Sequence, residues 1–292
     1  MAEGSRVLNT GDPSRLTHCL TFDIEEHFQV SAFDSPAQRG RWDSLESRVE
    51  RNTTKIVEVL GERGIRATFF ILGWVAERHP GLVRSIAQAG HEIASHGYAH
   101  EMITRQTPDQ FRQDIRKAKR ILEDVTGGAV LGYRAPSFTI VDRTKWALQV
   151  LVEEGYHYDS SIFPIRHDRY GMPGAQPHRH RWETSAGPIW EVPPATVQIA
   201  RARFPVAGGG YFRLFPYPLL RWLLKRAESE AEPLVMYLHP WEIDPDQPRM
   251  QGSWVSKFRH YLNLDKTEGR LRQLLSDFRF GPVKDVVAPL GV

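Results

Sequence analysis

Cysteine is almost absent from this sequence: Cys19 is the only one among 292 residues. A single thiol excludes an intramolecular disulfide framework and any metal site built from several cysteines. A metal bound by this chain would therefore rest on histidines and carboxylates. The sequence offers 12 histidines for that purpose.

Long apolar runs are lacking as well. No stretch approaches about 18 uninterrupted apolar residues, so no membrane span is predicted. Residues 1–16 contain no apolar segment of the length that a signal peptide needs, and they are predicted to form a short polar tail. The default expectation is therefore a cytoplasmic protein.

The chain also lacks a charge excess. Lys and Arg number 38 against 35 Asp and Glu, which leaves a formal charge of +3, and no basic block stands out. A nucleic-acid-binding stripe is therefore not expected. With 41% hydrophobic and 25% charged residues the composition is that of an ordinary globular protein.

Predicted strands and helices alternate along the chain. The spacing of apolar residues predicts strands at 18–24, 67–72, 90–95, 130–133, 156–160, 189–192, 196–199 and 234–239, and helices at 45–63, 76–89, 107–127, 143–154, 216–228 and 267–278. This alternation predicts an α/β fold with a parallel sheet or barrel. We expect one domain over 17–292, with an exposed loop insertion at 165–188 and a C-terminal helical extension at 246–292. In that extension Trp254, Phe258 and Tyr261 are expected to pack against the barrel.

Ionisable residues follow the predicted strands, where the chemistry of parallel α/β folds takes place. Asp23 and Glu25 point to the same face of the first strand, because strand side chains alternate. One could bind a metal while the other acts as a general base, or both could belong to a solvated acidic patch.

His96 and His100 follow the third predicted strand. Their spacing brings two imidazoles to one side of a turn, where a carboxylate would complete a two-histidine, one-carboxylate metal site. Zn²⁺ fits this donor set, and Co²⁺, Ni²⁺ or Fe²⁺ would fit too. An incidental pair of histidines is the alternative.

Two further strand ends carry candidate catalytic groups. Arg134 could hold Asp23 ionised through a bidentate contact, or form a structural salt bridge. His239 follows a buried strand and is a candidate general acid, with a core histidine as the alternative.

Four segments in this order resemble the polysaccharide deacetylases with a NodB homology domain, carbohydrate esterase family 4. They are Thr21-Phe-Asp-Ile-Glu25, Ser95-His-Gly-Tyr-Ala-His100, Arg134-Ala-Pro136 and Leu238-His239. The resemblance covers about residues 17–245. Residues 28–33 and 208–213 look more narrowly like the branch encoded beside exosortase-linked exopolysaccharide loci.

The resemblance implies a distorted (β/α) barrel and metal-dependent N-deacetylation of an N-acetylated glycan. Asp23 would be the base, His96 and His100 metal ligands, Arg134 the partner of Asp23, and His239 the acid. The family would place a backbone N–H that stabilises the oxyanion near 133–137.

One departure from the family pattern concerns the third metal ligand. The family usually has two adjacent aspartates in its first motif, and Ile24 stands where the second would be. Strand alternation returns Glu25 to the metal-facing side, so Glu25 is the predicted ligand. Glu26, or no carboxylate ligand, is the alternative.

Other positions complete the expected site. A cationic His239 needs a carboxylate partner, and Asp159 or Glu191 could serve. The side chains expected to bind the sugar, or else to pack in the core, are Tyr98, Tyr133, Tyr211 and Trp241.

Three other functions compete with a polysaccharide deacetylase. A metal-dependent amidohydrolase could act on a small amide, or the chain could be a catalytically inactive glycan-binding module. An oxygenase with the same metal donors is disfavoured, because it would leave Asp23, Arg134 and His239 without a role.

Overall fold

The computed structural model describes residues 16–167 and 170–288. The predicted tail at 1–16 lies almost entirely outside these residues. The strands are β1 (His18–Ile24), β2 (Thr68–Ile71), β3 (Glu92–Ser95), β4 (Gly132–Tyr133), β5 (Tyr158–Asp159), β6 (His180–Thr184), β7 (Gly187–Glu191), β8 (Thr196–Ile199), β9 (Ala202–Pro205), β10 (Val235–Leu238) and β11 (Phe280–Gly281).

One large sheet organises the molecule. Its order is β10-β1-β2-β3-β4-β5-β7-β6, and β11 also pairs with β1. Every neighbouring pair along this path is parallel except β6 with β7. All seven residues of β1 are buried, which explains why this strand is mostly apolar over its whole length. The predicted parallel α/β fold is confirmed.

The sheet curls toward a barrel without closing as a regular ladder in the part of the chain described here. The segment that follows β7 is joined to β10, at the other end of the sheet, by irregular backbone hydrogen bonds. Ala195 N–H donates to Val235 O over 3.0 Å, and Tyr237 N–H donates to Ala207 O over 2.8 Å. The distorted barrel expected from the sequence is therefore an open parallel sheet whose edges are joined by a loop.

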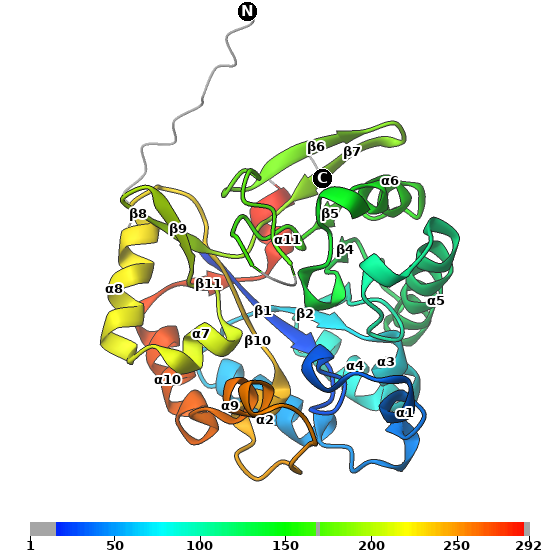
Figure 1. The fold of residues 1–292 in the computed structure, drawn as a ribbon, viewed down its shortest axis with the longest axis horizontal. Helices are drawn as coiled ribbons and strands as arrows, with labels where there is room; N and C mark the ends of the chain where they lie inside the picture. Colours follow the sequence, from blue (N-terminus) through cyan, green and yellow to red (C-terminus); the bar gives the residue numbers. More distant parts are fainter. Residues whose placement is uncertain (1–15, 168–169, 289–292) are drawn as a thin grey trace, which may run out of the picture.

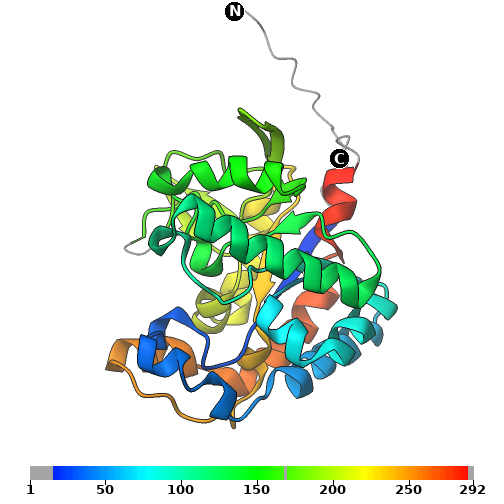
Figure 2. The same ribbon diagram turned by 90° about the vertical axis from the view of Figure 1, so that its right-hand side faces the viewer.

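Helices surround the sheet (Figures 1 and 2). They are α1 (Pro36–Arg39), α2 (Val49–Gly61), α3 (Gly73–Arg78), α4 (Pro80–Gln88), α5 (Pro108–Thr126), α6 (Trp146–Glu153), α7 (Gly209–Leu214), α8 (Tyr217–Glu228), α9 (Trp254–Tyr261), α10 (Leu264–Asp277) and α11 (Val283–Val287). Short 3-10 helices include η5 (Pro136–Phe138) and η7 (Pro240–Ile243). Within the described ranges, none of the helices has both the length and the apolar character needed to cross a bilayer.

Local signals define the ends of α5, the longest of these helices. Thr107 accepts a hydrogen bond from Gln110 N–H, and the Gln110 side chain accepts one from Thr107 N–H, which forms a capping box. Gly127 ends the helix in the left-handed conformation, with φ of 69°. The apolar face of the helix, including Phe111 and Ile115, is buried against the sheet layer.

The predicted loop insertion at 165–188 is partly wrong. Residues 180–184 form β6, which pairs antiparallel with β7 as an edge hairpin. Only His180 of this strand is buried, so its apolar pattern is too weak to be recognised. A second hairpin, β8–β9, lies outside the main sheet. In the predicted C-terminal extension, β11 returns to pair with β1.

Candidate metal and catalytic site

A cavity of about 430 Å³ opens at the carboxyl ends of the parallel strands. Five residues predicted to carry chemistry line it: Asp23, Glu25, His96, His100 and His239. They come from β1, from the loop after β3 and from the end of β10. Strand order alone brings them together, because β10, β1, β2 and β3 are neighbours in the sheet.

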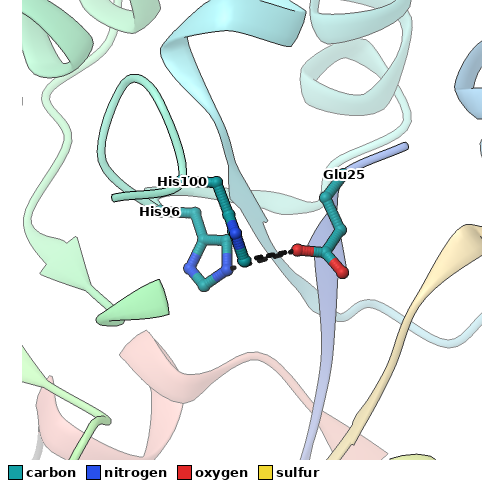
Figure 3. Close-up of side chains that lie close together, drawn as sticks. All are labelled: Glu25, His96 and His100. Carbon is teal, nitrogen blue, oxygen red and sulfur yellow. Dashed lines mark ion pairs between the residues drawn. The ribbon is translucent and has the colours of Figure 1, made fainter. Parts of the chain in front are cut away.

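Glu25, His96 and His100 form a compact buried cluster. Their candidate ligand atoms all lie within 4.8 Å of one another. Glu25 Oε2 lies 2.7 Å from His100 Nε2 and 4.0 Å from His96 Nε2 (Figure 3). This oxygen is buried and has no partner in hydrogen-bonding geometry among the described residues. One carboxylate oxygen facing two imidazole nitrogens is a suitable donor set for a divalent cation.

His96 is held in the form that a metal ligand requires. Its Nδ1 lies 2.8 Å from Arg134 O, so Nδ1 carries the proton and Nε2 presents its lone pair to Glu25. Burial lowers the pKa of His96 to about 4, although the charges of Asp23 and Glu25 oppose this shift. The neutral imidazole therefore prevails at physiological pH.

Glu25 is held as a carboxylate. Burial by itself would raise its pKa, but the charges of His100 and His239 outweigh burial and hold the pKa well below the usual range. The Trp241 indole N–H also donates to Glu25 Oε1 over 3.1 Å. Glu25 thus presents one oxygen to Trp241 and the other to the histidines.

Glu26, the alternative ligand, serves another purpose. Its carboxylate accepts hydrogen bonds from Arg48 N–H at 3.0 and 3.2 Å and from the Ser47 hydroxyl, at the start of α2. These contacts satisfy a backbone donor at the first turn of the helix. The sequence alternation that favoured Glu25 over Glu26 agrees with this geometry.

The loop that carries His100 is clamped from two sides. Asp114 accepts hydrogen bonds from Tyr98 N–H and Ala99 N–H. Arg39 donates to the carbonyls of Ala99 and His100 at 2.7 and 3.1 Å. His100 itself has a positive φ of 51°, a strained conformation for a residue other than glycine. The clamp offsets this strain and keeps the imidazole directed at Glu25.

Asp23 and Arg134 pair as the sequence predicted. Arg134 donates from Nη1 to Asp23 Oδ1 over 2.7 Å, and Thr21 and Ser160 accept its other hydrogen bonds. The guanidinium also lies over the Phe70 ring, 4.1 Å from its centroid. Asp23 Oδ2 remains on the cavity side, 3.9 Å from His239 Nε2.

The carboxylate partner of His239 is Glu242, and the prediction of Asp159 or Glu191 is wrong. His239 Nδ1 lies 2.6 Å from Glu242 Oε1, within the tight turn of η7. Burial lowers the pKa of His239, but the Glu242 hydrogen bond and the nearby carboxylates outweigh it and raise the pKa to about 9. His239 is therefore cationic at neutral pH, as a general acid must be.

Arg213 holds Glu242 in turn. Its Nε donates to Glu242 Oε2 over 2.7 Å, and its remaining N–H groups donate to the carbonyls of Arg259, His260 and Leu262. Both members of this ion pair are buried. The segment 208–213 thus supports His239 through two successive contacts.

Asp159 and Glu191 form a separate buried pair on β5 and β7. They hydrogen-bond each other, and Asp159 also accepts from the Ser161 hydroxyl. Burial raises the pKa of Asp159 to about 6 and that of Glu191 well above its usual range. Ser160, which follows Asp159, accepts hydrogen bonds from Arg134.

Of the four aromatic residues predicted to bind the sugar, Tyr211 and Trp241 line the cavity. Trp241 is almost fully buried and stacks between His239 and His260, so it supports the site rather than offering a free face. Tyr133 is buried against Phe111 and Tyr156. The Tyr98 hydroxyl donates to Glu77, outside the cavity. Neither the Tyr98 nor the Tyr133 side chain lines the cavity.

Sequence reasoning missed Glu242 and part of the cavity wall. Glu242 stands three residues after His239, with Pro240 between them. This spacing favours a tight turn and could have indicated the contact. The cavity walls also contain Phe138 and Arg259, which the sequence did not single out, and Phe258, which was expected to pack against the barrel.

A parallel α/β sheet with a buried glutamate and two histidines at its carboxyl end defines the class of this protein: an α/β protein with a candidate metal centre. Comparison with known families agrees. Residues 15–158 match the polysaccharide deacetylase family, and residues 160–288 match a domain of unknown function, DUF3473. Residues 15–158, just under half of the chain, thus carry a polysaccharide deacetylase domain.

A curated relative supports the same assignment. The chain is 37% identical over 98 residues to a peptidoglycan-N-acetylglucosamine deacetylase of Bacillus cereus, a match that covers 33% of this chain and 36% of that protein. The chain thus spans only about a third of the length of this relative.

Solved structures extend the likeness to the whole fold. A structure from Mycobacterium smegmatis assigned to the polysaccharide deacetylases has a TM-score of 0.68 at 21% identity, covering 96% of this chain and 92% of that chain. An allantoinase has a TM-score of 0.58 at 16% identity, covering 92% and 87%. These likenesses show the fold, which is compatible with more than one substrate.

Proposed function

We propose that this protein is a metal-dependent N-deacetylase that removes acetyl groups from the N-acetylated sugars of a polysaccharide or its precursor. The proposal rests on one observation: three sets of residues lie at the same cavity. They are the Glu25–His96–His100 cluster, the Asp23–Arg134 pair and the His239–Glu242 pair. A metal donor set, an oriented carboxylate and a cationic histidine are the elements that hydrolysis of an amide requires.

Deacetylases of this family depend on a metal, and the donor set of this chain fits one. Glu25, His96 and His100 would hold it, because Glu25 Oε2 is buried without a hydrogen-bonding partner among the described residues and faces both imidazoles. Mixed imidazole and carboxylate ligands favour Zn²⁺, with Co²⁺, Ni²⁺ and Fe²⁺ as alternatives. When bound, the ion would polarise the acetamide carbonyl and acidify the attacking water.

Protons are moved by Asp23 and His239. Asp23 accepts the proton of the attacking water through Oδ2, while Arg134 keeps Oδ1 occupied and the carboxylate oriented. His239 donates its Nε2 proton to the departing amine, so that acetate and a free amino sugar are released. Glu242 holds the other ring nitrogen and keeps the imidazolium in place.

Ser137 is our candidate for the backbone donor to the developing oxyanion. Arg134 N–H donates to Ser95 O, Ala135 N–H donates to Ser161 Oγ, and Pro136 has no N–H. Ser137 follows them, lines the cavity and has a φ of 55°. A donor at this position would stabilise the tetrahedral intermediate by about 3–4 kcal/mol.

We propose that both family matches form one catalytic domain. Asp23, Glu25, His96, His100 and Arg134 lie in the first match, whereas His239 and Glu242 lie in the second. The two parts share one sheet, in which β10 pairs with β1 along four residues. Neither part contains the complete set of groups.

The test is acetate release by the purified, metal-loaded protein. N-acetylglucosamine oligomers and an N-acetylated exopolysaccharide are the substrates, and Asp23→Asn is the matched inactive control. We expect acetate and free amines in equal amounts with the wild type only. Hydrolysis of a small amide such as allantoin without activity on glycans would favour the amidohydrolase instead, and inert metal-loaded protein that still binds glycan would favour the inactive binding module.

A further inference from the structure

Helix α9 exposes its large apolar side chains and buries its polar ones. Ser256 and His260 face the interior, whereas Trp254 is 76%, Val255 48% and Phe258 46% exposed. The prediction that Trp254 and Phe258 would pack against the barrel is wrong. A surface helix normally buries its apolar face, so this arrangement is inverted.

The inversion follows from how α9 is anchored. His260 stacks on Trp241 with 4.2 Å between ring centroids, and its Nε2 lies 2.7 Å from Gln247 Oε1. Arg213 donates to the carbonyls at the end of the helix, including Arg259 O and His260 O. These polar contacts fix one face of α9 inward, and the opposite face with its aromatic rings is left outside.

The exposed face of α9 reaches the catalytic cavity at its C-terminal end, and Trp254 is joined to it through its stacking on Phe258. Phe258 and Arg259 line the 430 Å³ cavity that also contains Asp23 and His239. A second cavity of about 220 Å³ is lined by Val255 and Arg259 of the same helix, among others. The two cavities share Val30, Ala32, Gly210, Trp241 and Arg259. They therefore adjoin and run along α9.

Trp254 and Phe258 stack on each other and form one exposed aromatic surface, here called the ledge. Their rings stack with centroids 5.5 Å apart and an interplanar angle of 17°. They stand one helical turn apart, about 6 Å along the axis. Leu214 of α7, 49% exposed, also lines the catalytic cavity. Exposed apolar surface at the mouth of a cavity marks a binding site.

We propose that Trp254, Phe258 and Arg259 form a subsite that binds the sugar residues next to the one being deacetylated, which makes an oligomeric or polymeric glycan the preferred substrate. This inference rests on the proposed function. A pyranose ring has apolar C–H faces and a rim of hydroxyl groups. Stacked aromatic rings match the faces, and the Arg259 guanidinium supplies donors to the hydroxyls.

Continuity with the cavity favours a glycan over a membrane or a second copy of the chain. A substrate that extends out of the catalytic cavity along α9 passes Phe258 and Arg259, which belong to the cavity wall. Neither a lipid surface nor a partner chain would need the exposed ledge to join the cavity that holds Asp23.

The experiment compares Trp254→Ala, Phe258→Ala and the double variant with the wild type on N-acetylglucosamine dimer and hexamer. Trp222→Ala is the matched control, because Trp222 is 55% exposed, lines neither cavity and stands on α8, whereas Trp254 stacks on the cavity residue Phe258. We expect the hexamer-to-dimer ratio of kcat/KM to fall about three- to tenfold in each variant, mainly through KM, and to stay at the wild-type value in the control.

Binding is measured separately from turnover. Hexamer is titrated by calorimetry into metal-loaded Asp23→Asn protein with and without the two ledge substitutions, and Kd should rise by the same three- to tenfold or more. If no glycan is deacetylated but this binding still depends on the ledge, the proposed function fails and the subsite stands. An unchanged length preference and an unchanged Kd would overturn the subsite. Trp254-dependent binding to phosphatidylglycerol vesicles with glycan binding unaltered, or a dimer that the double variant dissociates, would overturn it as well.

Discussion

Replacing Glu242 with glutamine removes the negative charge that faces His239 Nδ1 at 2.6 Å. A buried hydrogen bond between charged groups contributes about 1.5–3 kcal/mol, which corresponds to about one to two pKa units. The pKa of His239, raised to about 9 in the intact pair, should fall by that amount. Because His239 must be protonated to act as an acid, the alkaline limb of kcat/KM should move to lower pH by about one to two units.

The assay is acetate release across pH 6 to 10 (roughly the range that brackets this pKa), with wild type and variant at the same metal loading. Equal loading matters because a bound cation would offset the charge of Glu25, which also raises the pKa of His239. Glu242→Gln also leaves Arg213 without its carboxylate, so a loss of roughly 3 kcal/mol of stability is expected. Circular dichroism identifies the temperature range in which the variant is folded.

Glu92→Gln is the matched control. Glu92 is a buried carboxyl group that accepts hydrogen bonds from Thr68, Tyr158 and Lys284 N–H, none of which belongs to the site. Its loss should lower stability and leave the pH profile in place. An alkaline limb of Glu242→Gln that coincides with the wild type would refute the role of Glu242 and, with it, the assignment of His239 as the acid.

Three further predictions concern the metal and the base. His96→Ala should abolish metal binding, measured by elemental analysis of the dialysed protein, and full retention of metal would exclude the ligand set. Asp23→Asn should keep the metal and lower kcat by about 10²- to 10⁴-fold, and wild-type turnover would exclude Asp23 as the base. Glu25→Gln should weaken metal affinity, whereas Glu26→Gln should leave it unchanged and cost about 1 kcal/mol of stability at the start of α2; the reverse result would exchange their roles.

Local rules predicted the parts of the site that depend on one strand or one turn. The apolar run 18–24 predicted β1 with its observed bounds. Alternation along that strand then predicted that Asp23 and Glu25 share one face. Because Ile24 cannot bind a metal, alternation also favoured Glu25 over Glu26 as the third metal ligand. The distances from Glu25 to His96 and His100 agree with that expectation.

Strand alternation and apolar spacing could not predict contacts that depend on a tight turn or on a segment far away in the sequence. Glu242 reaches His239 because η7 turns tightly after Pro240, and it is stabilised there by Arg213 from another segment. Asp159 and Glu191 stand at the carboxyl ends of their strands, like the residues of the site, yet their side chains pair with each other. Sequence gives the residue type at each position but not which of several buried carboxylates faces a given imidazole.

The central strands of the parallel sheet, the residues at their carboxyl ends and the nature of the metal donors follow from the sequence by itself, because apolar runs, alternation and the near absence of cysteine are local or compositional properties. The order of the strands in the sheet comes from the tertiary structure. Only the tertiary structure decided the partner of His239, the support of Glu25 by Trp241 and the outward face of α9. Each of these depends on which polar groups come together in the interior, and those groups belong to segments far apart in the chain.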